Sequence, residues 1–418
     1  MKLAGRIAII VGVRETGAIC PVFGLRKENR PMYRIKTMNK IAAVGLQELP
    51  ADKYQISDDP DVYEGILVRS ASLHEVTFPK ELRAIARAGA GVNNIPVDRC
   101  SEQGIVVFNT PGANANAVKE LVLAALLYSS RDIFGGSQWV NNRVLEGVDV
   151  TTVVEKGKSN FIGPELQGKT LGIIGLGAIG AKVANAAVSL GMHVIGYDPF
   201  LTVDTALLLN THVHHTTNLD EIYRVSDYIT IHVPYNKDTA NTINAESIEK
   251  MKDGVRILNF ARGGLVNDEA VIAALESGKV ARYVTDFPTN ALAKTKNVIC
   301  TPHLGASTPE SEENCAVMAA QELKDYLENG NIVHSVNFPT VSMPRSGVGR
   351  LCVIHRNVHS VLANIIAIFA KQGVNVENMT NKSRGEYAYT MVDVNAEVGE
   401  DVREQINAMD NVIRVRLV

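Results

Sequence analysis

The stretch that decides the fold of this chain is KTLGIIGLGAIGAKVANAAVSLGMHVIGYD, residues 169–198. An apolar strand pattern at 170–174 leads directly into a glycine-rich turn, a helical pattern of small residues follows, and a second apolar strand at 192–197 ends on Asp198. A strand, a turn, a helix and a strand within about thirty residues form one βαβ unit of a doubly wound parallel sheet. The fold class predicted from this unit is therefore α/β with a Rossmann-type sheet.

The glycines of this turn are spaced for binding a dinucleotide. Gly175 permits the tight turn, Gly177 lets the backbone approach a pyrophosphate, and Gly180 lets the helix pack closely on the strand. A pyrophosphate would lie at the N-terminus of the helix, beside Ala178 and Ile179, where free N–H groups and the helix dipole favour an anion. A glycine-rich loop without this role is the alternative, but such a loop would not need the flanking strand and helix.

The acid at the tip of the second strand selects the cofactor. Asp198 stands eighteen residues after Gly180, where a carboxylate can accept hydrogen bonds from both ribose hydroxyls of an adenosine and would repel a 2′-phosphate. No basic residue follows in Pro199 and Phe200. The pattern therefore predicts NAD as the cofactor, in preference to NADP.

Composition excludes several classes of partner. The 418 residues carry 42 Lys and Arg against 45 Asp and Glu, a net charge of −3, so neither nucleic acid nor an anionic membrane is an expected partner. The apolar stretch 7–13 is cut short at Arg14, and no segment is long enough to be a membrane span. The cysteines form no CxxC pair, which argues against a disulfide framework and against a metal site and favours a reducing compartment. They are Cys20, Cys100, Cys300, Cys315 and Cys352.

The pattern along the chain divides it into several parts, and the length allows roughly two to four domains. Residues 1–31 show no clean periodicity and are an extension of uncertain status. Short apolar strands then alternate with helical stretches, as in a small flavodoxin-like α/β domain. The predicted parts after the extension are a discontinuous domain made of 32–128 and 311–337, a dinucleotide-binding domain at 129–310, a linker at 338–348 and a C-terminal domain at 349–418.

Two further patterns bear on assembly. Residues 116–130 form a long, almost wholly apolar helix that is suited to burial between two domains or two subunits. Residues 349–418 run strand, helix, strand, strand, helix, strand, which is the order of a ferredoxin-like fold with an exposed sheet edge. The apolar helix is expected to be buried, and the exposed sheet edge is expected to pair with another strand. A homodimer or homotetramer is therefore expected.

Two short motifs carry the residues for a reaction. They are NFARGG at 259–264 and TPHLGAST at 301–308, and each follows the carboxyl end of a predicted strand. In a doubly wound sheet these ends border the ligand crevice, so Arg262 and His303 can face the same nicotinamide ring. A guanidinium can hold a carboxylate and polarise a carbonyl, and an imidazole can move the proton that accompanies hydride transfer. The pair therefore predicts hydride exchange with a 2-oxo or 2-hydroxy acid.

Taken together, these motifs resemble the D-2-hydroxyacid dehydrogenase family over residues 32–418. The family's other matching motifs are IHVP at 231–234, LVRSA at 67–71, RAGAGVNN at 87–94 and FNTPG at 108–112. The resemblance makes the discontinuous domain a substrate-binding domain. It implies further cofactor contacts at His232, Val233, Pro234, Ala261, Asp286 and Gly305. It implies substrate contacts at Arg69, Ser70, Arg87, Gly91, Val92, Asn93 and Asn109.

The resemblance also implies the reaction. In members of the family that act on a phosphorylated acid, arginines of the first two loops meet the phosphate, which here implies Arg69 and Arg87. The expected activity is NAD-dependent oxidation of 3-phospho-D-glycerate to 3-phosphooxypyruvate, the first step of L-serine biosynthesis, with His303 as general base and Arg262 on the carboxylate. The alternatives are an NAD-dependent dehydrogenase of another D-2-hydroxy acid and a catalytically weak NAD-sensing regulatory protein.

The chain departs from the family at the residue that orients the catalytic histidine. The family has a glutamate there, and aligning residues 287–289 places Asn290 at this position. A neutral amide can hold an imidazole but cannot stabilise its protonated form as a carboxylate does. The residues leave open whether Asp286 replaces the glutamate, contacts the nicotinamide amide or supports the end of its strand.

The C-terminal domain resembles an ACT domain, a regulatory fold that binds amino acids where two copies pair. His355, Asn357 and Asn375 match positions that hold serine in related dehydrogenases, which implies L-serine as an effector. Residues 358–360, VHS, stand where the family's turn has proline and glycine, so use of the ACT pair for assembly alone stays open. The protein is expected in the cytoplasm.

Overall fold

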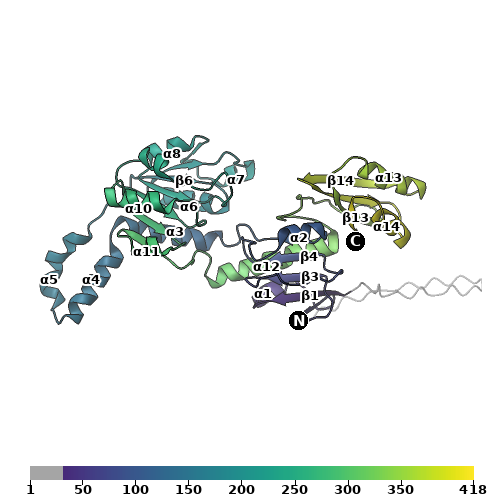
Figure 1. The fold of residues 1–418 in the computed structure, drawn as a ribbon, viewed down its shortest axis with the longest axis horizontal. Coiled ribbons are helices and arrows are strands. Elements are labelled where there is room, and N and C mark those ends of the chain that lie inside the picture. Colours follow the sequence, from purple (N-terminus) through teal and green to yellow (C-terminus); the bar gives the residue numbers. More distant parts are fainter. Residues whose placement is uncertain (1–31) are drawn as a thin grey trace, which may run out of the picture.

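The computed structural model describes residues 32–418, and the predicted extension 1–31 lies outside the described residues. Three sheets organise the described chain, one of five strands, one of seven and one of four. Figure 1 shows them as three bodies, with the seven-stranded body at the left, the five-stranded body in the middle and the four-stranded body at the right. The fold class predicted from the sequence, two parallel α/β units followed by a small antiparallel unit, is confirmed.

The five-stranded sheet of the first unit is parallel, with the order β2-β1-β3-β4-β5. Strand β3 is fully buried, as expected where helices cover both faces of a parallel sheet. Helix α12 (Pro309–Asn329) returns from the second unit to pack here, which makes the first unit discontinuous. Gly45 allows this contact, because a Cβ at this position would lie 2.5 Å from the carbonyl carbon of Ala316. The other elements are β1 (Tyr33–Met38), α1 (Ala43–Leu46), β2 (Tyr54–Ser57), β3 (Gly65–Val68), β4 (Ala84–Arg87), α2 (Val97–Glu102) and β5 (Val106–Phe108).

The seven-stranded sheet of the second unit is also parallel, with the order β12-β11-β10-β9-β6-β7-β8. The strand order reverses between β6 and β9, and the crevice beyond the carboxyl ends of these two strands is where such sheets bind ligands. Five or six strands are predicted from the sequence, and the additional strand is β8 (Val213–Thr216) at the edge. Its sequence VHHT contains two histidines, which are both exposed at the edge of the sheet. The strand therefore has no apolar pattern by which it could be predicted. The other elements are β6 (Thr170–Ile174), α6 (Ala178–Ser189), β7 (His193–Tyr197), α7 (Val203–Leu208), α8 (Leu219–Val225), β9 (Tyr228–Ile231), α9 (Ala245–Glu249), β10 (Val255–Asn259), α10 (Asp268–Ser277), β11 (Val280–Thr285), α11 (Asn290–Lys294) and β12 (Val298–Cys300).

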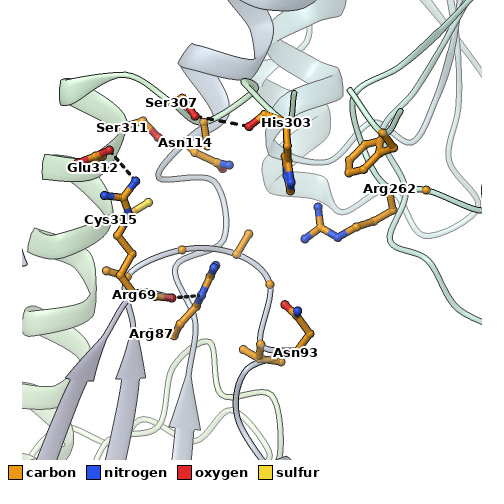
Figure 2. A pocket seen from close by; sticks show the side chains of 18 residues that line it. Arg69, Arg87, Asn93, Asn114, Arg262, His303, Ser307, Ser311, Glu312 and Cys315 are labelled. Atoms are coloured by element: carbon orange, nitrogen blue, oxygen red, sulfur yellow. Dashed lines mark hydrogen bonds and ion pairs between the residues drawn. The ribbon is translucent and has the colours of Figure 1, made fainter. Parts of the chain in front are cut away.

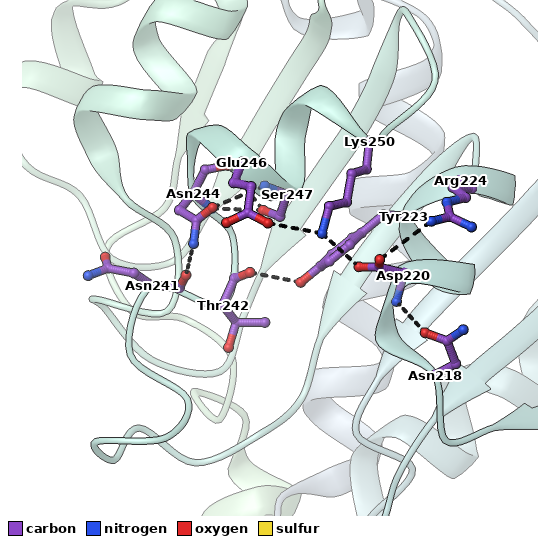
Figure 3. Close-up of polar contacts among 10 residues, drawn as sticks. All are labelled: Asn218, Asp220, Tyr223, Arg224, Asn241, Thr242, Asn244, Glu246, Ser247 and Lys250. Atoms are coloured by element: carbon purple, nitrogen blue, oxygen red, sulfur yellow. Dashed lines mark hydrogen bonds and ion pairs between the residues drawn. The ribbon is translucent and has the colours of Figure 1, made fainter.

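Polar contacts between α8 and α9 fix the loop that follows β9 (Figure 3). Lys250 bridges the carboxylates of Asp220 and Glu246 at 3.0 and 3.1 Å. The hydroxyl of Tyr223 donates to the carbonyl of Thr242 at 2.8 Å, and this residue closes the loop that begins at His232. The network therefore anchors a segment that borders the ligand crevice.

Helix α3 (Ala115–Ser130) is the apolar helix predicted for residues 116–130. It packs against α6 and the strands β10 and β11 of the same chain. These elements bury one side of the helix, so that side is covered within the subunit. The arm that follows is different, because α4 (Ile133–Leu145), α5 (Val150–Gly157) and the 3-10 turn η1 (Lys158–Phe161) project from the body (Figure 1). No residue of α4 is buried, and Leu145 is 85% exposed.

The four-stranded sheet of the third unit is antiparallel, with the order β14-β15-β13-β16. Alternate residues of its strands face opposite sides, so Leu351 and Val353 pack under two helices while Cys352 and Ile354 pack against the first unit. The segment 338–348, predicted as a linker, runs along this contact. The elements are β13 (Gly349–Arg356), α13 (Val361–Lys371), β14 (Val376–Arg384), β15 (Tyr387–Val394), α14 (Glu400–Asn407) and β16 (Val412–Leu417).

The contact between the first and third units is centred on the C-terminal end of α12. The last turn of a helix leaves carbonyl groups without helical partners, and two arginines and a tyrosine of the third unit donate to this region. Arg416 donates to the carbonyls of Tyr326 and Leu327 at 3.1 and 2.9 Å. Arg350 and Tyr389 donate to the carbonyls of Asn329 and Gly330 at 2.9 and 2.6 Å.

A buried ion pair holds Arg350 in this position. Its Nε and Nη2 lie 2.6 and 2.7 Å from the two carboxylate oxygens of Asp393, and both side chains are at most 1% exposed. The hydrogen bond to Asp393 raises the pKa of Arg350. The pair therefore stays ionised inside the protein and ties β13 to β15.

Candidate active site

The glycine-rich turn has the geometry that its spacing predicts. Gly175 has a φ of +95°, a left-handed conformation that favours glycine. A Cβ at Gly180 would lie 1.9 Å from the carbonyl oxygen of Gly175, so only glycine lets α6 lie this close to β6. A Cβ at Gly177 would meet nothing within 4 Å. The open side of Gly177 and the N-terminus of α6, with Ala178 and Ile179, thus leave room for an anion.

The Asp198 carboxylate lies against this turn. One of its oxygens accepts a hydrogen bond from the backbone N–H of Leu176 and the other from that of Phe200, each at 2.9 Å. Each oxygen therefore keeps acceptor capacity for a ribose hydroxyl. His215 of the edge strand β8 donates to the Asp198 carbonyl at 2.8 Å and fixes the tip of β7.

A cavity of about 310 Å³ continues from the turn toward the first unit. It is lined by Gly177, Ala178, Ile179, His232, Val233, Pro234, Ala261, Arg262, Asp286, His303 and Gly305, which are all predicted site residues. Gly112 and Asn114 also line it and are not among the predicted site residues, although Gly112 ends the FNTPG motif and Asn114 follows two residues later. A Cβ at Gly112 would lie 3.0 Å from that of Ala178, so this loop covers the start of α6.

His232 lines this cavity and has a ring nitrogen without a hydrogen-bond partner in the described chain. Its Nε2 lies 3.0 Å from the hydroxyl of Thr230, and its Nδ1 is buried without a hydrogen-bond partner among the described residues. Burial lowers the pKa of the imidazole to about 3, so the ring is neutral at working pH. A buried polar atom without a partner and the open cradle at Gly177 both fit a dinucleotide in this cavity.

Asp286 supports the loop that carries His303. Its carboxylate accepts hydrogen bonds from the hydroxyl of Thr301 at 2.6 Å and from the backbone N–H groups of Leu304 and Gly305 at 2.7 and 2.8 Å. The residue is 1% exposed, and no hydrogen bond joins it to the imidazole within residues 32–418. These hydrogen bonds fit the alternative in which Asp286 supports the strand end, and Asp286 also lines the cavity next to the glycine-rich turn, where a contact with the nicotinamide amide stays open.

A second cavity of about 600 Å³ lies between the first and second units (Figure 2). Arg69, Arg87, Gly91, Val92 and Asn93 line it from the first unit, and Arg262 and His303 line it from the second. The two predicted catalytic side chains therefore face the predicted substrate loops across one space. Gly91 keeps this space open, because a Cβ there would lie 3.1 Å from Nη2 of Arg262.

Three guanidinium groups converge on this cavity. Arg87 donates through Nε to the carbonyl of Arg69 at 3.0 Å. Burial lowers the pKa of Arg87, Cys315 raises it, and the nearby charges of Arg262 and Arg69 lower it further. Arg69 is paired with Glu312 of α12 at 2.6 Å. The cavity thus has an excess of positive charge suited to a substrate with more than one negative group.

His303 lies where the chain turns sharply, with a φ of +56°. Its ring packs against that of Phe287, with 5.0 Å between centroids, and no described residue forms a hydrogen bond with its ring nitrogens. Asn290 is exposed at the start of α11 and is not among the residues that line either cavity. The structure therefore does not bring Asn290 to the imidazole, whose ring instead packs on Phe287.

Two predicted substrate residues lie outside both cavities. The backbone N–H of Ser70 is held by the side chain of Asn39 at 3.1 Å, and Ser70 is exposed. The amide of Asn109 donates to the carbonyl of Ala90 at 2.6 Å. Both therefore shape the loops of the cavity and do not line it.

The three predicted regulatory residues do not form one cluster within a chain. His355 is 2% exposed inside the sheet, and its ring nitrogens bond the carbonyl of Arg356 and the hydroxyl of Thr390 at 2.8 and 2.9 Å. Asn357 and Asn375 are exposed at opposite ends of the sheet, beside Gly385 and Asn395. The structure therefore does not place His355 at the surface with the other two, because its ring is buried and both of its nitrogens are hydrogen-bonded.

Neither a membrane span nor a metal cluster is found in the described part of the chain. None of its helices combines the length and the hydropathy needed to cross a bilayer. Residues 32–418 bring together no three His, Cys, Asp or Glu side chains that could hold a metal ion.

Two regions of the chain match known families. Residues 123–305 match the family model described as D-isomer specific 2-hydroxyacid dehydrogenase, NAD binding domain. Residues 351–414 match an AHAS small subunit-like ACT domain. The first match covers the glycine-rich turn, Arg262 and His303.

Relatives cover more of the chain. A D-3-phosphoglycerate dehydrogenase of Escherichia coli (strain K12) is 35% identical over 358 residues, which are 82% of this chain and 83% of that protein. Another of Synechocystis sp. is 36% identical over 68% of this chain, which spans only 50% of that relative's length. The structure of NAD+-bound 3-phosphoglycerate dehydrogenase in Entamoeba histolytica aligns with a TM-score of 0.58 at 26% identity, covering 73% of this chain and 99% of that one.

Proposed function

Because the chain belongs to the D-isomer specific 2-hydroxyacid dehydrogenase family, we propose that it oxidises 3-phospho-D-glycerate to 3-phosphooxypyruvate with NAD, the first step of L-serine biosynthesis. The observation that carries the proposal is the convergence of Arg69 and Arg87 with Arg262 and His303 on one cavity. The first two arginines suit a phosphate, and the latter pair suits the reacting carbon with its carboxylate. The names of the relatives support the same substrate.

The proposed chemistry assigns one task to each group. Arg262 binds the substrate carboxylate and holds the C2 oxygen through its planar N–H donors. His303 accepts the proton of the C2 hydroxyl while hydride leaves C2. NAD, when bound, supplies the hydride acceptor. Because His303 is exposed and has no carboxylate partner among the described residues, it passes its proton on to solvent.

The test of substrate class is the pair of variants Arg87→Ala and Arg69→Ala. A hydrogen bond from a charged group contributes about 1.5–3 kcal/mol, so Arg87→Ala is expected to raise the KM for 3-phospho-D-glycerate roughly 10- to 100-fold. Arg69→Ala is expected to have a smaller effect, because this guanidinium must leave Glu312 to reach the phosphate. The measurement is NADH formation with 3-phospho-D-glycerate and with D-glycerate.

The ratio of kcat/KM values for the two acids distinguishes the proposed substrate from an unphosphorylated acid. The two variants are expected to lower kcat/KM for 3-phospho-D-glycerate and to leave that for D-glycerate nearly unchanged. Arg224→Ala, which removes an arginine of an exposed ion pair outside both cavities, serves as the matched control. An equal loss for both acids would favour another D-2-hydroxy acid as substrate.

Cofactor choice is tested at Asp198. Asp198→Ala removes both acceptors for the ribose hydroxyls and is expected to weaken NAD binding roughly 10- to 100-fold. Binding of NADP is expected to change little or to improve, because a repelling charge is lost. Fluorescence titration of both cofactors measures this, with Asp204→Ala on the exposed helix α7 as control. An unchanged NAD affinity would refute the assignment of Asp198.

Assembly into a homodimer or homotetramer is part of the proposal. The apolar residues Ile133, Phe134, Val144 and Leu145 of the arm are 50–85% exposed, which supports the arm as a subunit contact. Sedimentation velocity is expected to show a dimer or larger, and Val144→Glu with Leu145→Glu is expected to weaken it. Asn142→Glu adds a charge to the same helix as a control. A monomer at micromolar concentration would contradict this prediction.

An effector role for the C-terminal unit follows from assembly. The match to an ACT domain supports an amino-acid ligand, and we propose L-serine. Because Asn357 and Asn375 lie at opposite ends of one sheet, a common site for them needs two copies of the chain. A cytoplasmic location is also part of the proposal.

A further inference from the structure

A cavity of about 500 Å³ lies where the third unit meets the first. We name it the junction cavity. Lys80 and Arg83 line it from the loop before β4, and Arg403, Arg414 and Arg416 line it from α14 and β16. None of its lining residues contributes to the two cavities of the candidate active site.

The junction cavity has an excess of positive charge. Its five basic side chains face two acidic ones, Glu81 and Glu400. Glu400 is already paired with Arg403. Within residues 32–418, no carboxylate forms an ion pair with Lys80, Arg83, Arg414 or Arg416.

Backbone carbonyls and aromatic rings hold these arginines in place. Arg414 donates to the carbonyls of Leu82 and Lys80. Arg416 lies 4.4 Å from the ring centroid of Tyr326, and its Nε is buried without a partner among the described residues. These contacts fix the cations without neutralising them.

The guanidinium of Arg83 has an aromatic contact but no hydrogen-bond acceptor among the described residues. It lies 5.8 Å from the ring centroid of Tyr33. Burial lowers the pKa of Arg83, and the charge of Arg416 lowers it further. Docking of the two units explains why Arg414 and Arg416 are present, but Arg83 and Lys80 form no ion pair with a carboxylate of the described residues. Fixed, partly buried cations of this kind are stabilised by an anion.

We propose that the junction cavity binds a small phosphorylated anion, held by Arg83 and Arg414 with Lys80 at the rim. The planar N–H fork of arginine matches phosphate oxygens. The volume is within the range of small-molecule sites, about 300–1,000 Å³, and exceeds the need of a single phosphate ion, so a small organic phosphate fits better than inorganic phosphate.

Binding at this place would link the two units. Lys80 and Arg83 belong to the first unit, whereas Arg414 belongs to the third. A Cβ at Gly104 would lie 3.0 Å from that of Arg414, so the end of α2 already packs closely on β16. An anion shared by both sides therefore stabilises this docked arrangement.

The test is calorimetric titration of the full chain with glycerol 2-phosphate and with inorganic phosphate, at ionic strength held constant with sodium chloride. Arg69→Ala and Arg87→Ala are combined in the background, so that phosphate binding in the candidate active site is removed. Saturable binding is expected to persist in this background. Tighter binding of glycerol 2-phosphate assigns an organic phosphate, and equal binding assigns phosphate itself.

Variants at the junction cavity complete the experiment. In the same background, Arg83→Gln is expected to weaken binding about tenfold or more, as loss of a charged hydrogen bond does. Lys80→Gln, at an exposed position, is expected to weaken it severalfold with an unchanged melting temperature. Arg224→Gln is the control on the second unit. Absence of binding in the background, or equal affinity in Arg83→Gln, would overturn the proposal.

Discussion

Replacing His303 with asparagine is expected to lower the turnover number for 3-phospho-D-glycerate by about 10²- to 10⁴-fold, with unchanged affinity for NAD. The imidazole is the general base of the proposed reaction. Within the described chain, the other titratable side chains that line the substrate cavity of about 600 Å³ are the three arginines, Glu312 and Cys315. Asparagine is the informative substitution because it tolerates a positive φ, and residue 303 has a φ of +56°. The loop should therefore keep its conformation while the proton acceptor is lost.

Rapid kinetics and cofactor titration measure the two quantities separately. His193→Asn removes an exposed histidine at the start of β7 and is expected to leave both unchanged. A variant with asparagine at 303 that keeps its turnover would mean that another group takes the proton. A variant that also loses NAD binding would mean that the loop held by Asp286 has collapsed.

Replacing Asp393 with asparagine is expected to destabilise the third unit by about 3–5 kcal/mol, because the charge of Arg350 is left buried without its partner. Both side chains of this ion pair are at most 1% exposed. Differential scanning calorimetry of the full chain is expected to show a transition lowered by more than about 10 °C.

A compensated variant distinguishes loss of the pair from loss of packing. Arg350→Met with Asp393→Leu removes both charges and is expected to recover most of the stability. About 1 kcal/mol is expected to stay lost, since the carbonyl of Asn329 loses its donor. Arg356→Ala breaks an exposed ion pair with Glu386 and is expected to cost less than about 1 kcal/mol. If the compensated variant were as unstable as Asp393→Asn, packing rather than charge would be responsible.

The parts of the site that follow local rules could be predicted from the sequence. Gly175, Gly177 and Gly180 are spaced by the geometry of a single turn, so their surroundings follow from the chain itself. Arg262 and His303 are far apart in sequence, yet each follows the end of a parallel strand, and the rule for such sheets brings them to one crevice.

The parts that depend on packing between distant segments could not be predicted. Glu312 has the pattern of a solvated helix face, and only the return of α12 to the first unit turns it toward Arg69. His355 has the sequence context of a turn, but β13 extends one residue beyond it. The junction cavity has no sequence signature, because its basic residues come from segments around 80–83 and 403–416.

One helix joins the candidate active site to the C-terminal unit. Helix α12 has 21 residues and is therefore about 30 Å long. Its first turns supply Ser311, Glu312 and Cys315 to the substrate cavity, and its last carbonyls accept hydrogen bonds from Arg350 and Arg416. Truncation of the chain after α12 would expose the apolar surface of the first unit that packs on the third unit. It would also remove the arginine side chains that donate to the last carbonyls of the helix. The C-terminal unit therefore shares a buried core with the first unit, and α12 carries residues of the substrate cavity at one end and the contact with this unit at the other.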